Sequence, residues 1–453
     1  MNAPDWTGRK LHFVAIGGAG MSGLALVCHR LGARVSGSDR AESSYLRRLR
    51  AAGIEARVGH DPGAVPEDAE VVVSTAIASD NPELARARER GQRVIHRGRL
   101  LAEVCSQKRL IAVAGAHGKT TTAGMLTWLA VGRSAFFLGG ELPGLGAEGE
   151  PANAGWEPDA EWVIAEADES DASFLELEPE IAVVTNVELD HHSRWSGRAE
   201  LVQAFHRFAA PASSLVLPAD AALDSIPSGQ RVVRFDRDRP GPPLGLTVPG
   251  AHNVLNARAA LAAAELAGIG SADSLARRLE RFPGMLRRLQ RKGSCDGAEI
   301  YDDYAHHPTE VEATLAALRE LEPRRLIAVF QPHLYSRTRA LATRFGAALT
   351  AADEVGVFDV YAAREQPVGE LAGVSGLDVA RAAADHSRGR PVWWLRDAET
   401  ALRRLRGHLR EGDLLVTIGA GDIHELASQL VDEQMPAASS TWLPGAGSEE
   451  ARG

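Results

Sequence analysis

The chain has 453 residues, 45% of them apolar and 24% charged, and a formal net charge of −10 at pH 7. This composition is ordinary for a globular protein of two or three domains, and the negative charge argues against nucleic acid as the main partner. Three widely spaced cysteines, no apolar run of the roughly 18 residues that cross a bilayer and no secretory signal lead us to expect a cytoplasmic protein without disulfides.

Short apolar segments alternate with helical segments along the chain. Such alternation predicts an α/β protein with parallel sheets. Helices are expected at residues 21–31 and 257–267, among others. Buried parallel strands are predicted at residues 11–16, 34–37, 71–74, 110–114, 162–165, 181–185, 326–330, 355–360, 392–395 and 414–418.

The segments group into three predicted domains. They comprise residues 1–108, 109–281 and 282–433, and the Ser/Gly/Pro/Glu-rich tail at 434–453 is expected to be disordered. The Gly/Pro-rich stretch at 139–149 is predicted to be a surface loop.

The first domain opens with a glycine-rich turn. Residues 18–23, GAGMSG, follow the first predicted strand, and Asp39 ends the second strand about twenty residues on. This spacing fits a dinucleotide fingerprint and so favours an NAD-dependent oxidoreductase. The same surface would suit a UDP-sugar, because glycines let any diphosphate approach the backbone, and tight helix–strand packing alone is a third interpretation.

The second domain begins with the most informative residue, Lys119, one of only four lysines in the chain. It lies in residues 114–122, AGAHGKTTT, directly after a predicted strand. Backbone N–H groups of such a loop bind phosphate, a lysine reaches the terminal phosphates, and the Thr120 hydroxyl can bind Mg²⁺. Val113 stands where the usual phosphate-loop pattern has glycine, so the loop is a variant, and a plain strand-to-helix turn is the alternative.

Acidic and polar clusters follow two further strands of this domain. Residues 166–171, EADESD, and 186–192, NVELDHH, each come directly after a predicted strand. Carboxylates there could hold Mg²⁺ if the strand ends converge, although a solvated turn has the same composition. The adjacent histidines lack the spacing of a zinc site.

Polar residues farther along are ambiguous when taken singly. Asn253 and Asn256 fall on one helical face, where they could cap the helix or contact a base or phosphate. Arg287 and residues 301–310, YDDYAHHPTE, could be functional or a surface cluster.

Taken together, these motifs resemble the Mur ligases of bacterial cell-wall synthesis. The resemblance implies three domains: a Rossmann-like N-terminal domain, a central P-loop ATPase and a Rossmann-like C-terminal domain. The matching strings run in order from about residue 11 to 420: IGGAGMSGLA (16–25), GSD (37–39), STAI (74–77), NPE (81–83), the Lys119 loop, EADESDASFL (166–175), VTN (184–186), HNVLNA (252–257), DDYAHHPTE (302–310), FQPH (330–333), YAARE (361–365) and GVS (373–375).

The resemblance also implies a reaction. ATP would phosphorylate the carboxylate of UDP-N-acetylmuramate, and the amine of L-alanine would displace phosphate from the resulting acyl phosphate. ATP and Mg²⁺ are then required, and the substrates are small molecules. Because the implied ATP contacts come from the second and third domains, the site is expected to be complete only when these domains close.

Site residues follow from the same resemblance, position by position. Lys119, Glu166 and His191 are implied to be catalytic, and Thr120, Glu166 and His191 to bind metal. The implied ATP contacts are Gly115, Ala116, His117, Gly118, Lys119, Thr120, Thr121, Asn253, Asn256, Arg287 and Asp302; the UDP-sugar contacts are Gly18, Gly20, Ser38, Asp39 and Ser74; and the amino-acid pocket comprises Tyr304, His306, Arg337 and Arg339.

The chain departs from the family pattern at three places. Ala116 replaces a usual threonine, Ala305 replaces a common glycine, and the stretch between His192 and His252 is short, which predicts a trimmed central sheet. Three rival functions stay open: a recycling ligase that adds a tripeptide to UDP-N-acetylmuramate, an NAD oxidoreductase, and a nucleotide-binding regulator without turnover.

Overall fold

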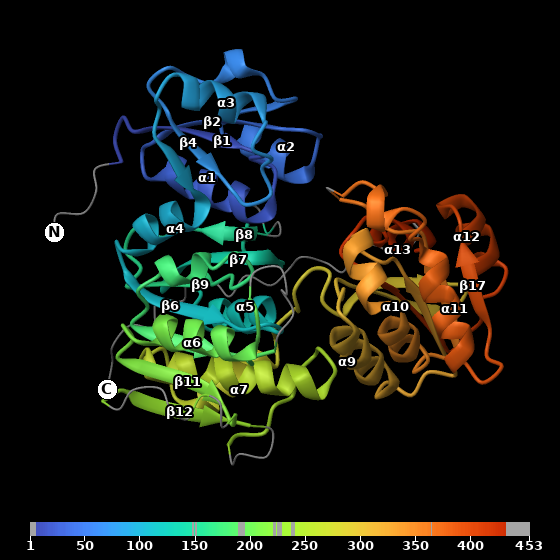
Figure 1. The fold of residues 1–453 in the computed structure, drawn as a ribbon. Helices are drawn as coiled ribbons and strands as arrows, with labels where there is room; N and C mark the ends of the chain where they lie inside the picture. The colour runs from blue at the N-terminus through green and yellow to red at the C-terminus, as the bar shows by residue number, and fades with distance from the viewer. Residues whose placement is uncertain are drawn as a thin grey trace. The chain divides into compact units, whose positions relative to one another are not determined.

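The computed structural model of the chain describes residues 6–146, 149, 152–188, 195–220, 223, 229–236, 241–363 and 365–431. Two compact units divide it, one of Met1–Gly140 with Asn153–Gly284 and one of Glu141–Ala152 with Met285–Gly453 (Figure 1). The α/β prediction is confirmed, because three β-sheets with intervening helices make up the described chain. The predicted domain bounds remain a prediction.

The first sheet belongs to the first unit and is parallel throughout, with strand order β3-β2-β1-β4-β5. This is the order of a Rossmann-like sheet, in which successive strands are added on one side of β1 up to β3 and on its other side from β4 onward. Its strands are β1 Lys10–Val14, β2 Arg34–Asp39, β3 Glu55–Val58, β4 Glu70–Val73 and β5 Val94–His96, and its helices are α1 Ala19–Arg30, α2 Ser44–Ala51, α3 Pro82–Glu89 and α4 Arg97–Cys105.

The second sheet, in the same unit, has seven strands in the order β12-β11-β10-β6-β9-β7-β8. Strand β6 is central and runs parallel to both neighbours, β9 and β10. The strands are β6 Arg109–Ala114, β7 Ser134–Leu142, β8 Ala152–Gly155, β9 Trp162–Glu166, β10 Ile181–Val184, β11 Ser214–Pro218 and β12 Arg231–Phe235, and the helices are α5 Lys119–Leu129, α6 Arg198–Ala209, α7 Ala251–Leu266 and α8 Ala272–Leu279.

The third sheet forms the second unit and has the order β13-β14-β18-β15-β16-β17. Only the edge strand β13 runs antiparallel to its neighbour. The strands are β13 Gln290–Cys295, β14 Ala298–Asp303, β15 Arg325–Phe330, β16 Glu354–Phe358, β17 Val392–Leu395 and β18 Asp413–Ile418, and the helices are α9 Pro308–Arg319, α10 Tyr335–Leu349, α11 Gly376–His386, α12 Ala398–Arg406 and α13 His424–Leu430.

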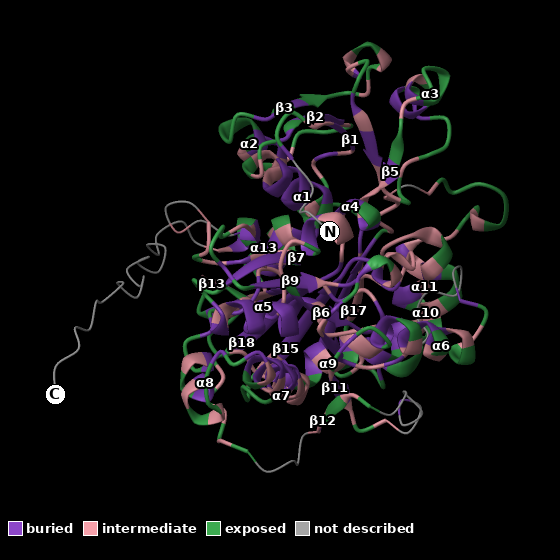
Figure 2. Cartoon of the chain, turned by 90° about the vertical axis from the view of Figure 1, so that its left-hand side faces the viewer, coloured by how far each residue is buried: buried purple, intermediate pink, exposed green. Residues whose placement is uncertain are grey.

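Hydrophobic side chains fix the helices to the sheets. Along β15, Ala328 and Phe330 pack with α9, α10 and α11, whereas Ile327 and Val329 pack with α12 and α13. This alternation places helices on both faces of the third sheet, as expected for a doubly wound fold. In the first unit one cluster of buried residues extends through both sheets, and the strand interiors are accordingly buried (Figure 2).

Every strand predicted from the sequence is present, and both named helices are present with earlier starts. The predicted loop at residues 139–149 is partly wrong, since β7 continues to Leu142. The short stretch before His252 still supplies β11 and β12 to the second sheet. The predicted disordered tail lies outside the described residues, and within those that are described no helix is both long and apolar enough to cross a membrane.

Candidate active site

The loop between β6 and α5 has a backbone that only glycine fits at two positions. Gly115 and Gly118 have φ of +137° and +79°, the left-handed region that side chains disfavour. A Cβ placed on Gly118 would also lie 2.4 Å from Oδ1 of Asn256. The loop therefore wraps closely around the start of α5 and presents uncapped backbone N–H groups there, because no side chain caps this helix.

Lys119, the first residue of α5, is held at this loop. Its Nζ donates to the carbonyl oxygen of Gly115 at 2.6 Å and to Oε2 of Glu169 at 2.8 Å. Burial lowers the pKa of Lys119, but the carboxylates of Glu169, Asp168 and Glu166 outweigh it and the pKa is raised. A fixed positive charge thus sits beside the phosphate loop. The sequence alone indicates no specific role for Glu169, which is one of four acidic residues within the segment 166–171.

Thr120 and Glu166 converge on one point, as a metal site requires. Thr120 Oγ1 donates to Glu166 Oε1 at 3.0 Å, and Gly139 N donates to the other carboxylate oxygen at 2.7 Å. A hydroxyl and a carboxylate at the mouth of a phosphate loop are the hard oxygen donors that suit Mg²⁺. His191, the third predicted ligand, lies outside the described residues.

Residues after β10 support the phosphate loop from the neighbouring strand. Thr185 Oγ1 donates to the carbonyl oxygen of His117 at 2.6 Å, and Asn186 Oδ1 accepts from His117 N at 3.0 Å. The His117 ring faces Glu188 at 3.2 Å. The sequence analysis noted Asn186 only as part of a motif and gave it no role of its own. The feature that could have indicated its role is its position just after β10, the strand beside β6.

The two asparagines of α7 brace α5. Asn256 Oδ1 accepts from Thr122 Oγ1 at 3.2 Å, its Nδ2 donates to Asn253 Oδ1 at 3.2 Å, and Asn253 Nδ2 donates to Pro249 O at 2.7 Å. Both side chains are buried. The structure therefore gives them a packing role, and the adenine contact stays a prediction.

The first sheet carries the second glycine loop at the switch between β1 and β4. Gly18 and Gly20 lie at the start of α1, which has no side-chain cap, while Asp39 Oδ2 accepts from Gly17 N at 2.9 Å and so holds the loop. Ser74 follows β4 and is partly exposed. Uncapped N–H groups at this edge suit a diphosphate.

Ser38, another predicted UDP contact, is buried. Its hydroxyl donates to Glu83 Oε2 at 2.5 Å and contacts His60 Nδ1 at 2.8 Å. Glu83 is fully buried; burial raises its pKa, but the partners His12 and Ser38 outweigh it and the pKa is lowered. The structure thus places Ser38 beneath the surface, inside a network that the sequence did not reveal.

In the second unit, Arg287 and Asp302 lie together. Arg287 Nε donates to Asp302 Oδ2 at 3.3 Å, and its Nη2 donates to the carbonyl oxygen of Gly419 at 2.7 Å. Asp302 is fully buried and also accepts from Thr417 Oγ1 at 2.6 Å. The pair fixes the start of the third sheet to the loop after β18.

Three of the four predicted amino-acid-pocket residues are linked by a chain of contacts that passes through His333. The His306 ring lies 5.4 Å from the Tyr304 ring and 6.3 Å from the His333 ring, and Arg337 Nη1 lies 3.4 Å from His333 Nδ1. Burial lowers the pKa of His306, which favours its neutral form. Arg339 is instead engaged by another residue, since its Nη2 donates to Glu370 Oε2 at 2.8 Å in an exposed ion pair.

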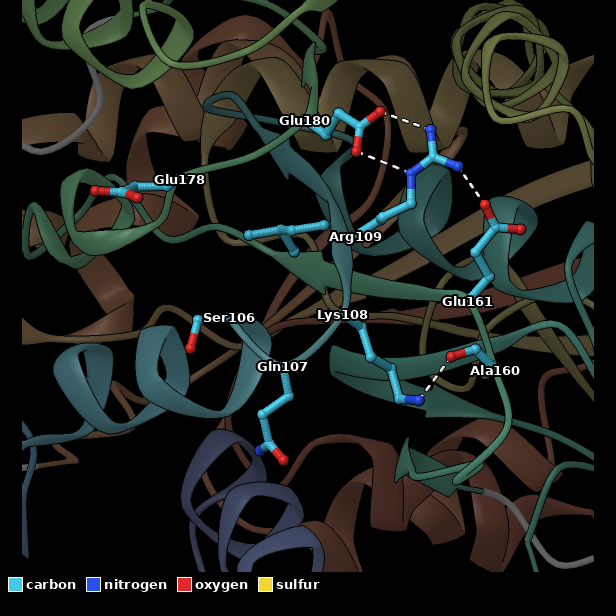
Figure 3. Close-up of a pocket in the computed structure, with 9 residues that line it drawn as sticks. Ser106, Gln107, Lys108, Arg109, Ala160, Glu161, Glu178 and Glu180 are labelled. Atoms are coloured by element: carbon cyan, nitrogen blue, oxygen red, sulfur yellow. Dashed lines mark hydrogen bonds and ion pairs between the residues drawn. The ribbon is translucent and has the colours of Figure 1, made fainter. Parts of the chain in front are cut away.

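A separate charged hollow lies at the amino ends of β6, β9 and β10 (Figure 3). Its two basic side chains are already engaged: Arg109 Nε donates to Glu180 Oε2 at 2.9 Å and Arg109 also pairs with Glu161, while Lys108 Nζ donates to Ala160 O at 2.6 Å. Parallel sheets bind ligands at the opposite, carboxyl ends, where the two glycine loops lie. We therefore assign the candidate site to those loops.

Two family models match the chain. The model described as Mur ligase family, catalytic domain, matches residues 10–109. The model described as Mur ligase, glutamate ligase domain, matches residues 287–421. The matched segments contain all the strands of the first and third sheets.

Known proteins are similar over nearly the whole chain. The UDP-N-acetylmuramate–L-alanine ligase of Kineococcus radiotolerans is 43% identical, with 93% of this chain and 96% of the relative covered. The enzyme of the same name from Mycolicibacterium vanbaalenii is 41% identical, covering 94% and 96%.

Solved structures share the fold. The UDP-N-acetylmuramate-alanine ligase of Thermotoga maritima superposes with a TM-score of 0.77 at 27% identity, covering 93% of this chain and 98% of the other. A murein peptide ligase from Psychrobacter arcticus has a TM-score of 0.67 at 24% identity with the same coverage, a likeness of fold alone.

Proposed function

The chain belongs to the Mur ligase family, and from this premise we propose that it uses ATP to join L-alanine to UDP-N-acetylmuramate in peptidoglycan synthesis. The observation that carries the proposal is the identity of 41–43% with ligases of that name over more than 90% of the chain. The two loops of the first unit support it, because each presents uncapped helical N–H groups suited to a nucleotide phosphate.

The chemistry explains why a phosphate-binding loop is needed. A carboxylate does not acylate an amine, since oxide would have to leave. Transfer of the terminal phosphoryl group of ATP to the carboxylate oxygen gives an acyl phosphate and ADP. The amine of L-alanine then attacks the acyl carbon, and phosphate leaves as the amide forms. The chain's task is to position the reactants and to stabilise the developing charge.

Lys119 and its loop would hold the terminal phosphates of ATP. The ammonium already lies at the loop, 2.6 Å from Gly115 O, so it needs little rearrangement to meet a phosphate oxygen. Its charge is fixed by Glu169, which keeps it protonated and oriented. Positive charge placed before the reaction is the main contribution that a phosphoryl-transfer site can make.

Mg²⁺ would be held by Thr120 and Glu166, whose oxygens lie 3.0 Å apart. Once bound, the ion would neutralise charge on the transferring phosphoryl group. We assign His191 to a second ion on resemblance alone.

For L-alanine we propose the group of Tyr304, His306 and Arg337. A guanidinium would bind the carboxylate of the amino acid. Arg339 is kept as a candidate, although its guanidinium is engaged by Glu370. The neutral form that burial favours for His306 leaves one ring nitrogen able to accept a hydrogen bond from the substrate amine.

Two alternatives have less support. The tripeptide-adding ligase is supported by solved structures of about 24% identity, below the 41–43% of the L-alanine ligases. An NAD oxidoreductase leaves the Lys119–Glu169 and Thr120–Glu166 pairs without a role.

The test is phosphate release with ATP, Mg²⁺ and UDP-N-acetylmuramate across L-alanine, L-serine, glycine and the tripeptide. We expect L-alanine to give the highest kcat/KM, with L-serine and glycine less strongly rejected than larger ligands, because small pockets discriminate weakly among small side chains. Preference for the tripeptide would favour the recycling ligase, and binding of NADH without phosphate release would favour the oxidoreductase.

A further inference from the structure

One arginine of the first unit lies between the glycine loop of the first sheet and the acidic segment that follows β9. Arg97 is the first residue of α4 and follows β5 directly. Its Nη2 donates to Asp168 Oδ2 at 2.8 Å and to Asp171 Oδ2 at 3.2 Å. Both acids belong to the segment that follows β9 and Glu166, so Arg97 joins the first sheet to the edge of the second sheet that carries the phosphate loop.

The other side of the guanidinium faces the glycine loop of the first sheet. A Cβ placed on Gly20 would lie 2.9 Å from Arg97 Nη1. A side chain at this position would displace the guanidinium from its place at the start of α1. Gly20 is therefore explained by the approach of a side chain as well as by the approach of a ligand.

Arg97 has hydrogen-bonding capacity that the protein does not use. Both its ion pairs are made by Nη2, and across the described residues no hydrogen bond is made by Nη1 or Nε. The side chain is 25% exposed. A guanidinium has five N–H donors in a planar fork, which suits paired phosphate oxygens better than any other side chain.

These features converge at one place. The backbone N–H groups at the start of α1 are uncapped by any side chain, and Nη1 of Arg97 lies beside them. Backbone donors at a helix start together with an arginine fork form a strong anion-binding arrangement. Asp168 and Asp171 hold the guanidinium in position, which reduces the entropy that it loses on meeting a ligand.

We propose that Arg97 binds the diphosphate of the UDP-linked substrate at the glycine loop, with Asp168 and Asp171 as its positioning residues. The proposal rests on the proposed function, which assigns the glycine loop to that substrate. It adds a specificity-determining contact that sequence motifs did not indicate, since Arg97 lies outside every motif that carried the family resemblance.

The placement also joins the two nucleotide-binding regions. Asp168 contacts Arg97, and the next residue, Glu169, binds Lys119 at 2.8 Å. The cation proposed for the UDP diphosphate and the cation proposed for the ATP phosphates are thus held by consecutive residues of one segment.

The experiment measures the dissociation constants of uridine, UMP and UDP by titration calorimetry for the full-length chain and for Arg97→Met. The diphosphate contact predicts that Arg97→Met weakens UDP by about tenfold or more, while uridine changes less than about twofold. Arg97→Lys keeps the charge but not the fork, so it should weaken UDP by an intermediate factor.

Arg99→Met is the matched control on the same helix. Arg99 is 61% exposed and pairs with Glu176 on the surface, so all three affinities should stay unchanged. Equal weakening of uridine, UMP and UDP by Arg97→Met and Arg97→Lys would overturn the proposal, because it would show a purely structural role. Unchanged UDP affinity in folded Arg97→Met would also overturn it. If the wild-type chain bound none of the three ligands, the proposed function would fall together with the role of Arg97.

Discussion

Lys119 forms an ion pair with Glu169 inside the protein, and it is also proposed to bind the terminal phosphates of ATP. Substitution of Lys119 should therefore change both stability and activity, for different reasons. Glu169 is 2% exposed and depends on Lys119 for its charge balance. Lys119→Ala should abolish ligation, because the terminal phosphates lose their cation. It should also lower the thermal midpoint, since removal of one partner from a buried ion pair costs about 3–5 kcal/mol.

The double variant Lys119→Met with Glu169→Gln separates the two effects. It removes both charges, so most of the thermal midpoint should return while ligation stays absent. Lys292→Ala, at a lysine on the edge strand β13, serves as the control and should leave activity unchanged. Substantial phosphate release by Lys119→Ala would contradict the phosphate-loop role.

Glu166 offers a prediction on metal dependence. Its carboxylate meets Thr120 Oγ1 at 3.0 Å, and an amide is a weaker ligand for Mg²⁺ than a carboxylate. Glu166→Gln should therefore raise the Mg²⁺ concentration for half-maximal phosphate release by about tenfold. Glu176→Gln, at a surface acid of the same segment, should leave that concentration unaltered. An unshifted Mg²⁺ titration for Glu166→Gln would remove it as a ligand.

Single residues show which parts of the site the sequence could predict. Lys119 and Thr120 were identifiable because a phosphate loop has a fixed local spacing, and Glu166 because acids at strand ends collect ligands. Arg97 was not identifiable, and the string NPE gave the position of Glu83 but not its role, because the partners of both residues are distant in sequence and meet them only in the folded protein. Arg339 shows the reverse case, since a motif position alone did not reveal its pairing with Glu370.

At the scale of elements, burial explains why some strands could be predicted and others could not. Strand β6 is buried at five of its six residues and therefore appears as a continuous apolar run. Strand β12, at the sheet edge, has only one buried residue. Its Arg231 and Arg234 make the segment polar, so the sequence does not show the apolar run that indicates a buried strand. Edge strands such as β12 and β13 are exposed on one side and carry polar residues, so their hydrophobic pattern is weak.

The turn before α5 gives a prediction with a matched control. Gly118 and Gly132 have nearly equal φ of +79° and +76°, but a Cβ on Gly118 would meet Asn256 Oδ1 at 2.4 Å whereas a Cβ on Gly132 would meet nothing within 4 Å. Both alanine variants lose roughly 1 kcal/mol to the left-handed backbone. Gly118→Ala should lose roughly 1–3 kcal/mol more through the steric clash.

Chemical denaturation and ATP-analogue titration check this difference. Gly118→Ala should also weaken ATP binding, because the shifted Asn256 disturbs the start of α5, while Gly132→Ala should bind as the wild type does. Equal losses of stability in the two variants would show that α7 yields to the added methyl group.

For the whole molecule, the alternation of strands and helices predicted an α/β chain, and the described residues contain three sheets in two compact units. The sequence suggested three domains, of which the first two each open with a glycine-containing loop of their own. It could not show that the first two sheets share a hydrophobic cluster, which contains Leu24 of the first sheet's helix and Leu110 of β6. A hydrophobic cluster that spans two sheets is formed by side chains far apart in sequence. No local sequence pattern therefore predicts it.

This division predicts that a ligand of the first unit stabilises that unit selectively. A ligand that binds only the folded state stabilises it by RT ln(1 + [L]/Kd), about 2.7 kcal/mol at a hundredfold excess over Kd. UDP at that concentration should slow amide hydrogen exchange by up to about a hundredfold in β1, β2 and β4, and leave β15, β16 and β18 unaffected, because the second unit has cores of its own. Inorganic phosphate at the same concentration controls for ionic effects. Equal slowing in both units would mean that they unfold as one cooperative body, in spite of their separate cores.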